Sequence, residues 1–137
     1  MRGEWKIDIL FSGVSPMSNQ ATIWHYPRCS KSRKTLAILR DHGLTTEVRR
    51  YLEDPPSPEE VAAALTGLDS DPLELVRTSE ELFSELALDA DALDAASIAD
   101  LLAEHPKLIQ RPVVFTDRGT VIGRPPEKVY EILPPRS

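Results

Sequence analysis

Cys29 is the only cysteine of the chain, and it lies in the segment HYPRCSKSRKTL over residues 25–36. A thiol attacks only as its thiolate, and a free cysteine with a pKa of about 8.5 is mostly protonated at neutral pH. The residues that follow are typical of a helix, and the unpaired N–H groups at a helix N-terminus stabilise a negative charge. Arg28, Lys31 and Arg33 add positive charge nearby. The position of Cys29 therefore favours a reactive thiolate, and an inert, packed thiol is the other interpretation.

The loop around the cysteine is also suited to an anion. Backbone N–H groups at the start of a helix bind phosphate-like groups. Ser32 follows Cys29 by three positions and could donate a hydroxyl hydrogen bond to the sulfur. His25 ends a strand-like run, where a packed imidazole and a functional one are both common. The segment thus predicts a thiol site with room for an oxyanion.

Composition narrows the class of protein. The net charge of −6 argues against nucleic acid or an anionic membrane as the partner. No apolar run approaches the roughly 20 residues that a membrane span needs. A lone cysteine excludes an internal disulfide, a CxxC redox pair and a multi-cysteine zinc site, and it suits a reducing compartment. We therefore expect a cytoplasmic protein with no metal site and no bound cofactor.

The 137 residues suffice for one domain with its own core. The first residues make a poor signal peptide, since they include Glu4 and Asp8 and only a short apolar patch. Met17 stands directly before the first regular element. We expect an extension without function over residues 1–16 and a single domain over residues 17–137.

Hydrophobic patterning predicts a strand, a helix and a second strand in the first half. A β-rich run predicts a strand over residues 21–26. Apolar residues at helical spacing predict a helix from about Ser30, and Gly43 suits its C-terminal end. Alternating residues predict a strand over residues 46–52.

A helical block is predicted next. Ser57, Pro58 and Glu60 form a capping-box pattern that begins one helix. Further helices are predicted within residues 71–88 and 94–106.

Two β runs around DRG, within residues 111–125, then predict a hairpin, and residues 126–133 predict a last helix. Consecutive strand, helix and strand imply a parallel pair, to which the hairpin adds antiparallel strands. The sequence therefore predicts an α/β protein with a thioredoxin-like fold and a helical insertion between its β-α-β and β-β-α halves.

Several motifs resemble the glutaredoxin-like arsenate reductases, the ArsC family. The run ATIWHYPRCSKSRKTLAIL is similar to the family's opening, with a short strand, a His-x-Pro-x-Cys loop and a serine three residues after the cysteine. The runs HPKLIQRPVVF and GRPPEKVYEIL resemble its two Arg-Pro segments, and YLEDPPSPEEV resembles its connection between strand and helix. The resemblance extends from about Met17 to about Pro134. Tyr26, however, stands where the well-studied reductases have asparagine, and the short C-terminal end resembles a short-tailed subgroup.

The resemblance implies roles for the residues of the loop. Cys29 matches the catalytic cysteine, which attacks arsenate and forms a cysteinyl arsenate. Ser32 and His25 match the residues that hold this sulfur as a thiolate. Pro112 matches a structural cis-proline next to the thiol.

Three arginines match the oxyanion-binding residues of the family: Arg77, Arg111 and Arg124. Arsenate is largely a dianion near neutral pH, and planar guanidinium groups suit its phosphate-like shape better than ammonium groups do. Without the resemblance each arginine has a plainer interpretation, because exposed arginines are common on helix surfaces and beside prolines.

Electron counting constrains the reductant. Reduction of As(V) to As(III) takes two electrons, and this chain offers one thiol. A relay of three cysteines within the chain is therefore excluded, and a second thiol must come from outside. The resemblance implies glutathione as co-substrate and glutaredoxin as the partner that releases arsenite.

Other functions remain open. A monothiol, glutathione-dependent thiol transferase could use the same cysteine, but it has no need of three arginines. An Spx-like regulatory binding protein would lack its switch, because the motif here is Cys-Ser-Lys-Ser instead of CxxC. A low-molecular-weight phosphatase is excluded, since Thr35 stands where its loop requires arginine.

Overall fold

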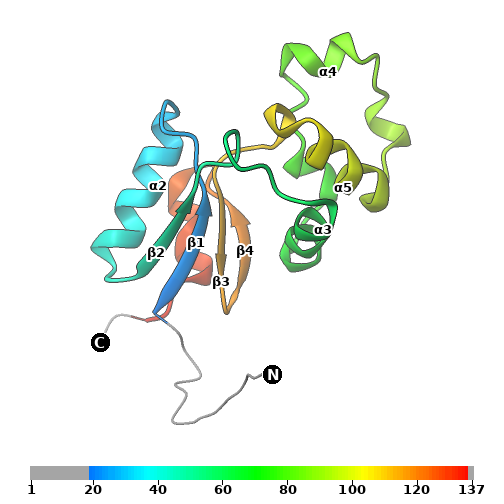
Figure 1. Cartoon of the computed structure of the whole chain (residues 1–137). Helices are drawn as coiled ribbons and strands as arrows, with labels where there is room; N and C mark the ends of the chain where they lie inside the picture. Colours follow the sequence, from blue (N-terminus) through cyan, green and yellow to red (C-terminus); the bar gives the residue numbers. More distant parts are fainter. Residues whose placement is uncertain (1–18, 136–137) are drawn as a thin grey trace.

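The computed structural model describes residues 19–135, so the extension expected over residues 1–16 lies outside the described residues. Both the β-α-β half and the β-β-α half expected from the sequence are present, and their strands form one sheet (Figure 1). Its strands are β1 (Gln20–Trp24), β2 (Thr45–Arg49), β3 (Val113–Thr116) and β4 (Gly119–Ile122).

The order of the strands in the sheet is β2-β1-β3-β4. β1 and β2 are parallel, because helix α2 (Ser30–Asp41) crosses over between them. β3 runs antiparallel to both β1 and β4. This arrangement confirms the thioredoxin-like fold with its helical insertion.

One face of the sheet is covered by α2 and by the last element, η4 (Pro126–Ile132). Alternate residues of β1, Ala21 and Ile23, point into this core, as the pleat of a strand requires. α2 contributes Leu36 and Leu39 from the stripe predicted by the helical spacing. η4 is a 3₁₀ helix in which the Lys128 N–H donates to the Pro125 carbonyl at 3.0 Å, whereas the sequence pattern predicted only a helix.

The insertion forms a second core at one end of the sheet, where β1 and β2 end (Figure 1). Its helices are α3 (Pro58–Gly67), α4 (Glu81–Glu85) and α5 (Ala95–Glu104), joined by the short 3₁₀ turns η1 (Pro72–Leu75), η2 (Ala90–Ala92) and η3 (Pro106–Leu108). Trp24, Val113 and Ile122 of the sheet pack into the same core and join the two parts.

The helical expectation for residues 71–88 is only partly right. Directly after η1 the chain is extended at Val76, which forms an isolated antiparallel bridge with Ile109, and a turn at residues 78–80 then leads into α4. The Arg77 N–H donates to the Leu108 carbonyl at 2.7 Å. These pairings with a distant segment replace the local hydrogen bonds that a continuous helix would have made.

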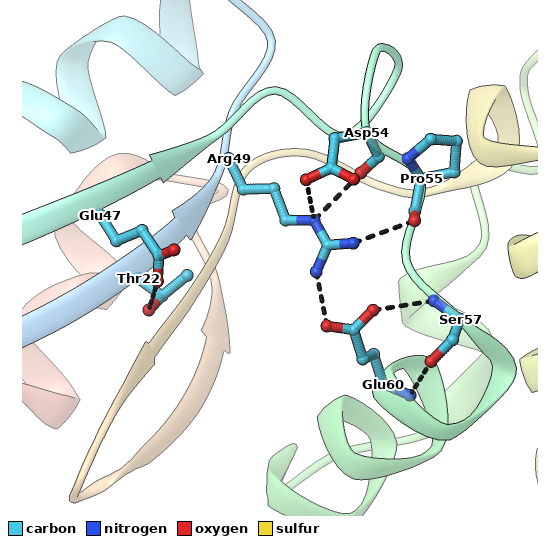
Figure 2. A network of polar contacts seen from close by, with 7 residues as sticks. All are labelled: Thr22, Glu47, Arg49, Asp54, Pro55, Ser57 and Glu60. Atoms are coloured by element: carbon cyan, nitrogen blue, oxygen red, sulfur yellow. Dashed lines mark hydrogen bonds and ion pairs between the residues drawn. The ribbon is translucent and has the colours of Figure 1, made fainter.

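The predicted capping box is present at the start of α3. The Glu60 N–H donates to Ser57 Oγ at 3.1 Å, and the Ser57 N–H donates to Glu60 Oε1 at 2.9 Å. Figure 2 shows that the other oxygen of Glu60 accepts a bond from Arg49 Nη1 at 2.6 Å. Arg49 also donates to the carbonyls of Asp54 and Pro55, at 3.0 and 2.9 Å. The side chain thus fastens the end of β2 to the connection that leads into α3.

Replacing Arg49 by alanine is expected to lower the free energy of unfolding by about 1–2 kcal/mol, because several charge-assisted bonds of a mostly buried guanidinium are lost together. Urea unfolding followed by circular dichroism measures this loss. Arg50→Ala is the matched control, since Arg50 makes an exposed ion pair with Glu53 at 3.5 Å, and its loss should cost at most about 0.5 kcal/mol. Equal effects of the two substitutions would contradict the role given to Arg49.

Candidate active site

Four separate chain segments meet at one edge of the sheet, because of the strand directions. Cys29 follows the end of β1, and Tyr51 follows the end of the parallel strand β2. β3 runs the opposite way, so Arg111 lies just before its start at this edge. Arg124 follows the end of β4, which returns to the same edge. The topology therefore gathers residues that are up to 95 positions apart, as in the case of Cys29 and Arg124.

Cys29 is the N-cap residue of α2, in the position that the helical pattern predicted. Its N–H donates to the Tyr26 carbonyl at 3.0 Å, which closes a tight turn after β1. The thiol is free and half-buried. The sulfur therefore lies at the positive end of the helix and within reach of solvent.

The environment lowers the pKa of the Cys29 thiol. Burial alone would raise this pKa, but hydrogen bonds from the backbone N–H groups of Ser32 and Lys31 and from the Arg111 side chain outweigh burial. The positive charge of Arg111 acts in the same direction. The site thus favours the thiolate, the form that attacks.

Ser32 and His25 form a buried pair behind the sulfur. His25 Nδ1 lies 2.6 Å from Ser32 Oγ, and the same oxygen accepts a bond from the Tyr26 N–H at 3.1 Å. The Ser32 contact with the sulfur is through its backbone N–H, not the hydroxyl bond that the sequence suggested. The hydroxyl instead holds the turn of residues 26–29 against β1.

Burial lowers the pKa of His25, and the positive charges of Arg50, Arg40 and Arg33 lower it further. The imidazole is therefore neutral at neutral pH, so it does not stabilise the thiolate by a positive charge. Its role is to hold the Ser32 side chain in position through the hydrogen bond between them.

Arg111 lies directly over the Tyr26 ring, with Cζ 4.7 Å from the ring centroid. The face of an aromatic ring attracts a guanidinium, so Tyr26 supports Arg111. The Arg111–Pro112 peptide bond is cis, and so is the Arg124–Pro125 bond.

Arg124 lies against the backbone of Arg111, because its Nη1 donates to the Arg111 carbonyl at 3.1 Å. The close approach depends on Gly123, whose N–H donates to the Pro112 carbonyl at 2.9 Å. A Cβ at this glycine would lie 2.6 Å from Thr35 Oγ1 and 2.9 Å from Pro112 Cγ. Arg124 also lines a surface cleft of about 430 Å³.

Arg77 comes from the insertion, in the extended stretch that the sequence predicted as helix. Its Nη1 donates to Gln110 Oε1 at 2.9 Å, and its Nε pairs with Glu80 at 3.5 Å. Gln110 Oε1 also accepts from the Arg111 N–H at 3.4 Å. Gln110 thus connects the arginine of the insertion to the arginine beside the thiol.

Sequence reasoning missed Gln110 and Tyr51. The only sequence signal for Gln110 is its place directly before the Arg-Pro pair, and for Tyr51 its place in the run YLEDPPSPEEV. Tyr51 was expected in a strand, but β2 ends at Arg49, and the Glu53 and Asp54 N–H groups both donate to the Arg50 carbonyl at 2.9 Å in a turn. The ring is fully buried.

Three buried side-chain polar atoms within residues 19–135 have no hydrogen-bond partner of good geometry: Tyr51 Oη, Arg77 Nε and Arg111 Nε. All three carry a hydrogen to donate. Cys29, Tyr51 and Arg111 lie at the same end of the sheet, and the charges of Arg111, Cys29 and Arg77 all act on the Tyr51 hydroxyl. Such a set of donors beside a thiolate is suited to an anion with several acceptor oxygens.

Residues 19–135 contain no group of three His, Cys, Asp or Glu side chains arranged to hold a metal ion. None of the helices in this range is long and apolar enough to cross a membrane.

Alkylation of Cys29 by iodoacetamide is expected to reach half its maximal rate at a lower pH in the folded protein than in the unfolded one. The thiolate is the reacting form, so the midpoint follows the thiol pKa, which the fold lowers. The same chain in urea provides the reference, since Cys29 is its only thiol. Coincident midpoints would show that the N–H groups and Arg111 do not act on the sulfur.

Comparisons of the sequence and of the structure with known proteins point to the same family. The model of the ArsC family matches residues 24–132. The arsenate reductase of Acidiphilium multivorum is 40% identical over 118 residues, which cover 86% of this chain and 83% of that protein. The "Uncharacterized protein YfgD" of Escherichia coli is 40% identical over 119 residues, which cover 85% of this chain and 99% of that protein. Among solved structures, an arsenate reductase from Vibrio cholerae matches with a TM-score of 0.79 and 42% identity, over 85% of this chain and 99% of that one.

Proposed function

The chain belongs to the ArsC family, and from this membership together with the site we propose that it is an arsenate reductase with Cys29 as its nucleophile. The observation that carries the proposal is the set of unpaired donors beside the thiol. Tyr51 Oη and Arg111 Nε are buried without a hydrogen-bond partner, and Arg77 Nε has only its 3.5 Å ion pair with Glu80, so an oxyanion with several acceptor oxygens would satisfy them.

The first step follows from these residues. Arg111 and the α2 N-terminus hold the Cys29 thiolate and attract the arsenate dianion to it. The sulfur attacks arsenic, one oxygen leaves as water after protonation, and a cysteinyl arsenate forms. We assign the stabilisation of the remaining negative oxygens to Arg77 and Arg124.

The two reducing electrons come from outside the chain. Cys29 is the only thiol, so this chain cannot form a disulfide within itself. Glutathione attacks the cysteinyl arsenate and displaces a second oxygen as water. A glutaredoxin thiolate then attacks the glutathione sulfur, so that a glutaredoxin–glutathione disulfide forms and the electron pair of the arsenic–sulfur bond stays on arsenic as As(III). Water hydrolyses the remaining bond to Cys29 and releases arsenite. The protein works in the cytoplasm, where glutathione keeps thiols reduced. His25 and Ser32 stay behind the sulfur throughout and keep the turn in place.

Arsenite production from arsenate by the purified protein tests this proposal. Glutathione and glutaredoxin are supplied together and then omitted in turn. Sustained production that requires both supports the full route. Production with glutathione alone would exclude glutaredoxin as the partner, and production with neither would contradict the external-thiol argument.

The second candidate is a monothiol thiol transferase, which the half-buried free thiol at the helix N-terminus also suits. The two functions differ in their need for the arginines. A mixed disulfide of glutathione is therefore offered to the same preparation. Its rapid reduction without any use of arsenate would favour the transferase.

A further inference from the structure

Tyr51 has a hydroxyl proton with no acceptor. Its ring is fully buried in the core of the insertion, and its oxygen has no hydrogen-bond partner of good geometry in the described part of the chain. The Arg111 guanidinium lies beside this oxygen, but a guanidinium only donates hydrogen bonds. Even a bond from Arg111 would therefore leave the tyrosine proton unpaired.

An unpaired hydroxyl in a core is unfavourable, so its acceptor is expected to come from elsewhere. Cys29 and Tyr51 follow the ends of the paired parallel strands β1 and β2, and the charges of Cys29, Arg111 and Arg77 act on the Tyr51 hydroxyl. Arg111 Nε is itself unpaired. Both unpaired hydrogens thus belong to residues at the end of the sheet that carries the Cys29 thiolate, where an incoming oxyanion would present its oxygens.

Building on the proposed function, we propose that Tyr51 is a further substrate-binding residue, which donates a hydrogen bond to an oxygen of the oxyanion held between Arg111 and the Cys29 sulfur. It is a neutral donor beside the charged guanidinium groups.

The protonation state of Tyr51 suits this role. Burial raises its pKa to about 12, against the opposing charge of Arg111. The hydroxyl therefore keeps its proton at neutral pH and adds no negative charge to an anion site.

The position of the hydroxyl is fixed before any ligand arrives. The ring is packed in the core, and the turn that carries it is held by Arg49, which donates to the Asp54 and Pro55 carbonyls (Figure 2). A donor that needs no rearrangement stabilises a developing charge most effectively.

Tyr51→Phe tests the inference, because it removes the oxygen and keeps the ring. Wild type and variant are treated with iodoacetamide at increasing arsenate, and the arsenate concentration that halves the rate of Cys29 alkylation is measured. Loss of a hydrogen bond to a charged group is expected to raise this concentration about tenfold to a hundredfold. Tyr130→Phe is the matched control, since Tyr130 is 56% exposed on η4, and its removal should leave the concentration unchanged.

Stability gives an independent readout. Removing an unpaired buried hydroxyl should leave the urea midpoint of Tyr51→Phe equal to or above that of wild type. A clear fall in this midpoint would mean that the hydroxyl supports the fold, and it would overturn the inference.

The protection experiment separates this inference from the proposed function. Equal half-protection in wild type and Tyr51→Phe, or no protection of either, overturns the role of Tyr51. Weaker protection of the variant supports that role even where wild type releases no arsenite, and that combination would contradict the reductase alone. Arsenite release with equal protection of both proteins would contradict Tyr51 alone.

Discussion

Cys29→Ser is expected to lower arsenite production by at least about a thousandfold, because the reaction loses its nucleophile. The Ser32 and Lys31 N–H groups and Arg111 lower the pKa of the Cys29 thiol and so favour its thiolate. The same groups leave a hydroxyl protonated at neutral pH. Arsenite released in the presence of glutathione and glutaredoxin measures the effect.

The fold of this variant should be intact. Cys29 is half-buried at the N-cap of α2, and serine is a favoured N-cap residue. Its urea midpoint should therefore equal or exceed that of wild type. Arsenite production at the wild-type rate by the folded variant would show that another group is the nucleophile.

Arg111→Ala is expected to lower kcat/KM for arsenate by about a hundredfold to a thousandfold, the loss usual for a donor that stabilises a developing oxyanion. Two effects combine in this loss. The oxyanion loses a charged donor, and the Cys29 thiol loses both a hydrogen bond and a positive charge that lower its pKa. The pH midpoint of Cys29 alkylation should therefore rise in this variant.

Two further arginine variants sharpen the second prediction. Arg111→Lys keeps the charge but not the planar fork over Tyr26, so it should recover only part of the activity. Arg118→Ala removes an arginine from the β3–β4 hairpin at the far edge of the sheet and should keep wild-type kcat/KM. An Arg111→Ala enzyme with wild-type kcat/KM and an unchanged alkylation midpoint would contradict the arginine site.

Local sequence patterns were sufficient where local contacts decide the structure. The helix after Cys29 and the Ser57–Glu60 capping box depend on residues within one or two turns, and both were predicted from spacing. Residues 71–88 were predicted less well, because the pairing of Val76 with Ile109 across 33 positions overrides the helical spacing there. Hydrophobic spacing within a short window does not predict pairings between such distant segments.

The residues of the candidate site also fall into those that a local sequence pattern predicts and those that it does not. His25, Cys29 and Ser32 lie within eight positions, so one turn brings them together. Arg77, Arg111 and Arg124 were selected through the family resemblance, since no local pattern links them. Tyr51 and Gln110 meet the site only through the strand order and the Gln110 bond to Arg77. By residue type alone, Tyr51 could equally be an ordinary core tyrosine, and Gln110 an ordinary surface amide.

The central claim is that the Cys29 sulfur bonds to arsenic. X-ray absorption at the arsenic edge tests it most directly, on protein incubated with arsenate and glutathione and then separated from small molecules. The account predicts an arsenic–sulfur neighbour in the protein-bound arsenic of wild type that is lost in Cys29→Ser. Arsenic surrounded by oxygen alone, or the same sulfur signal in both proteins, would contradict it.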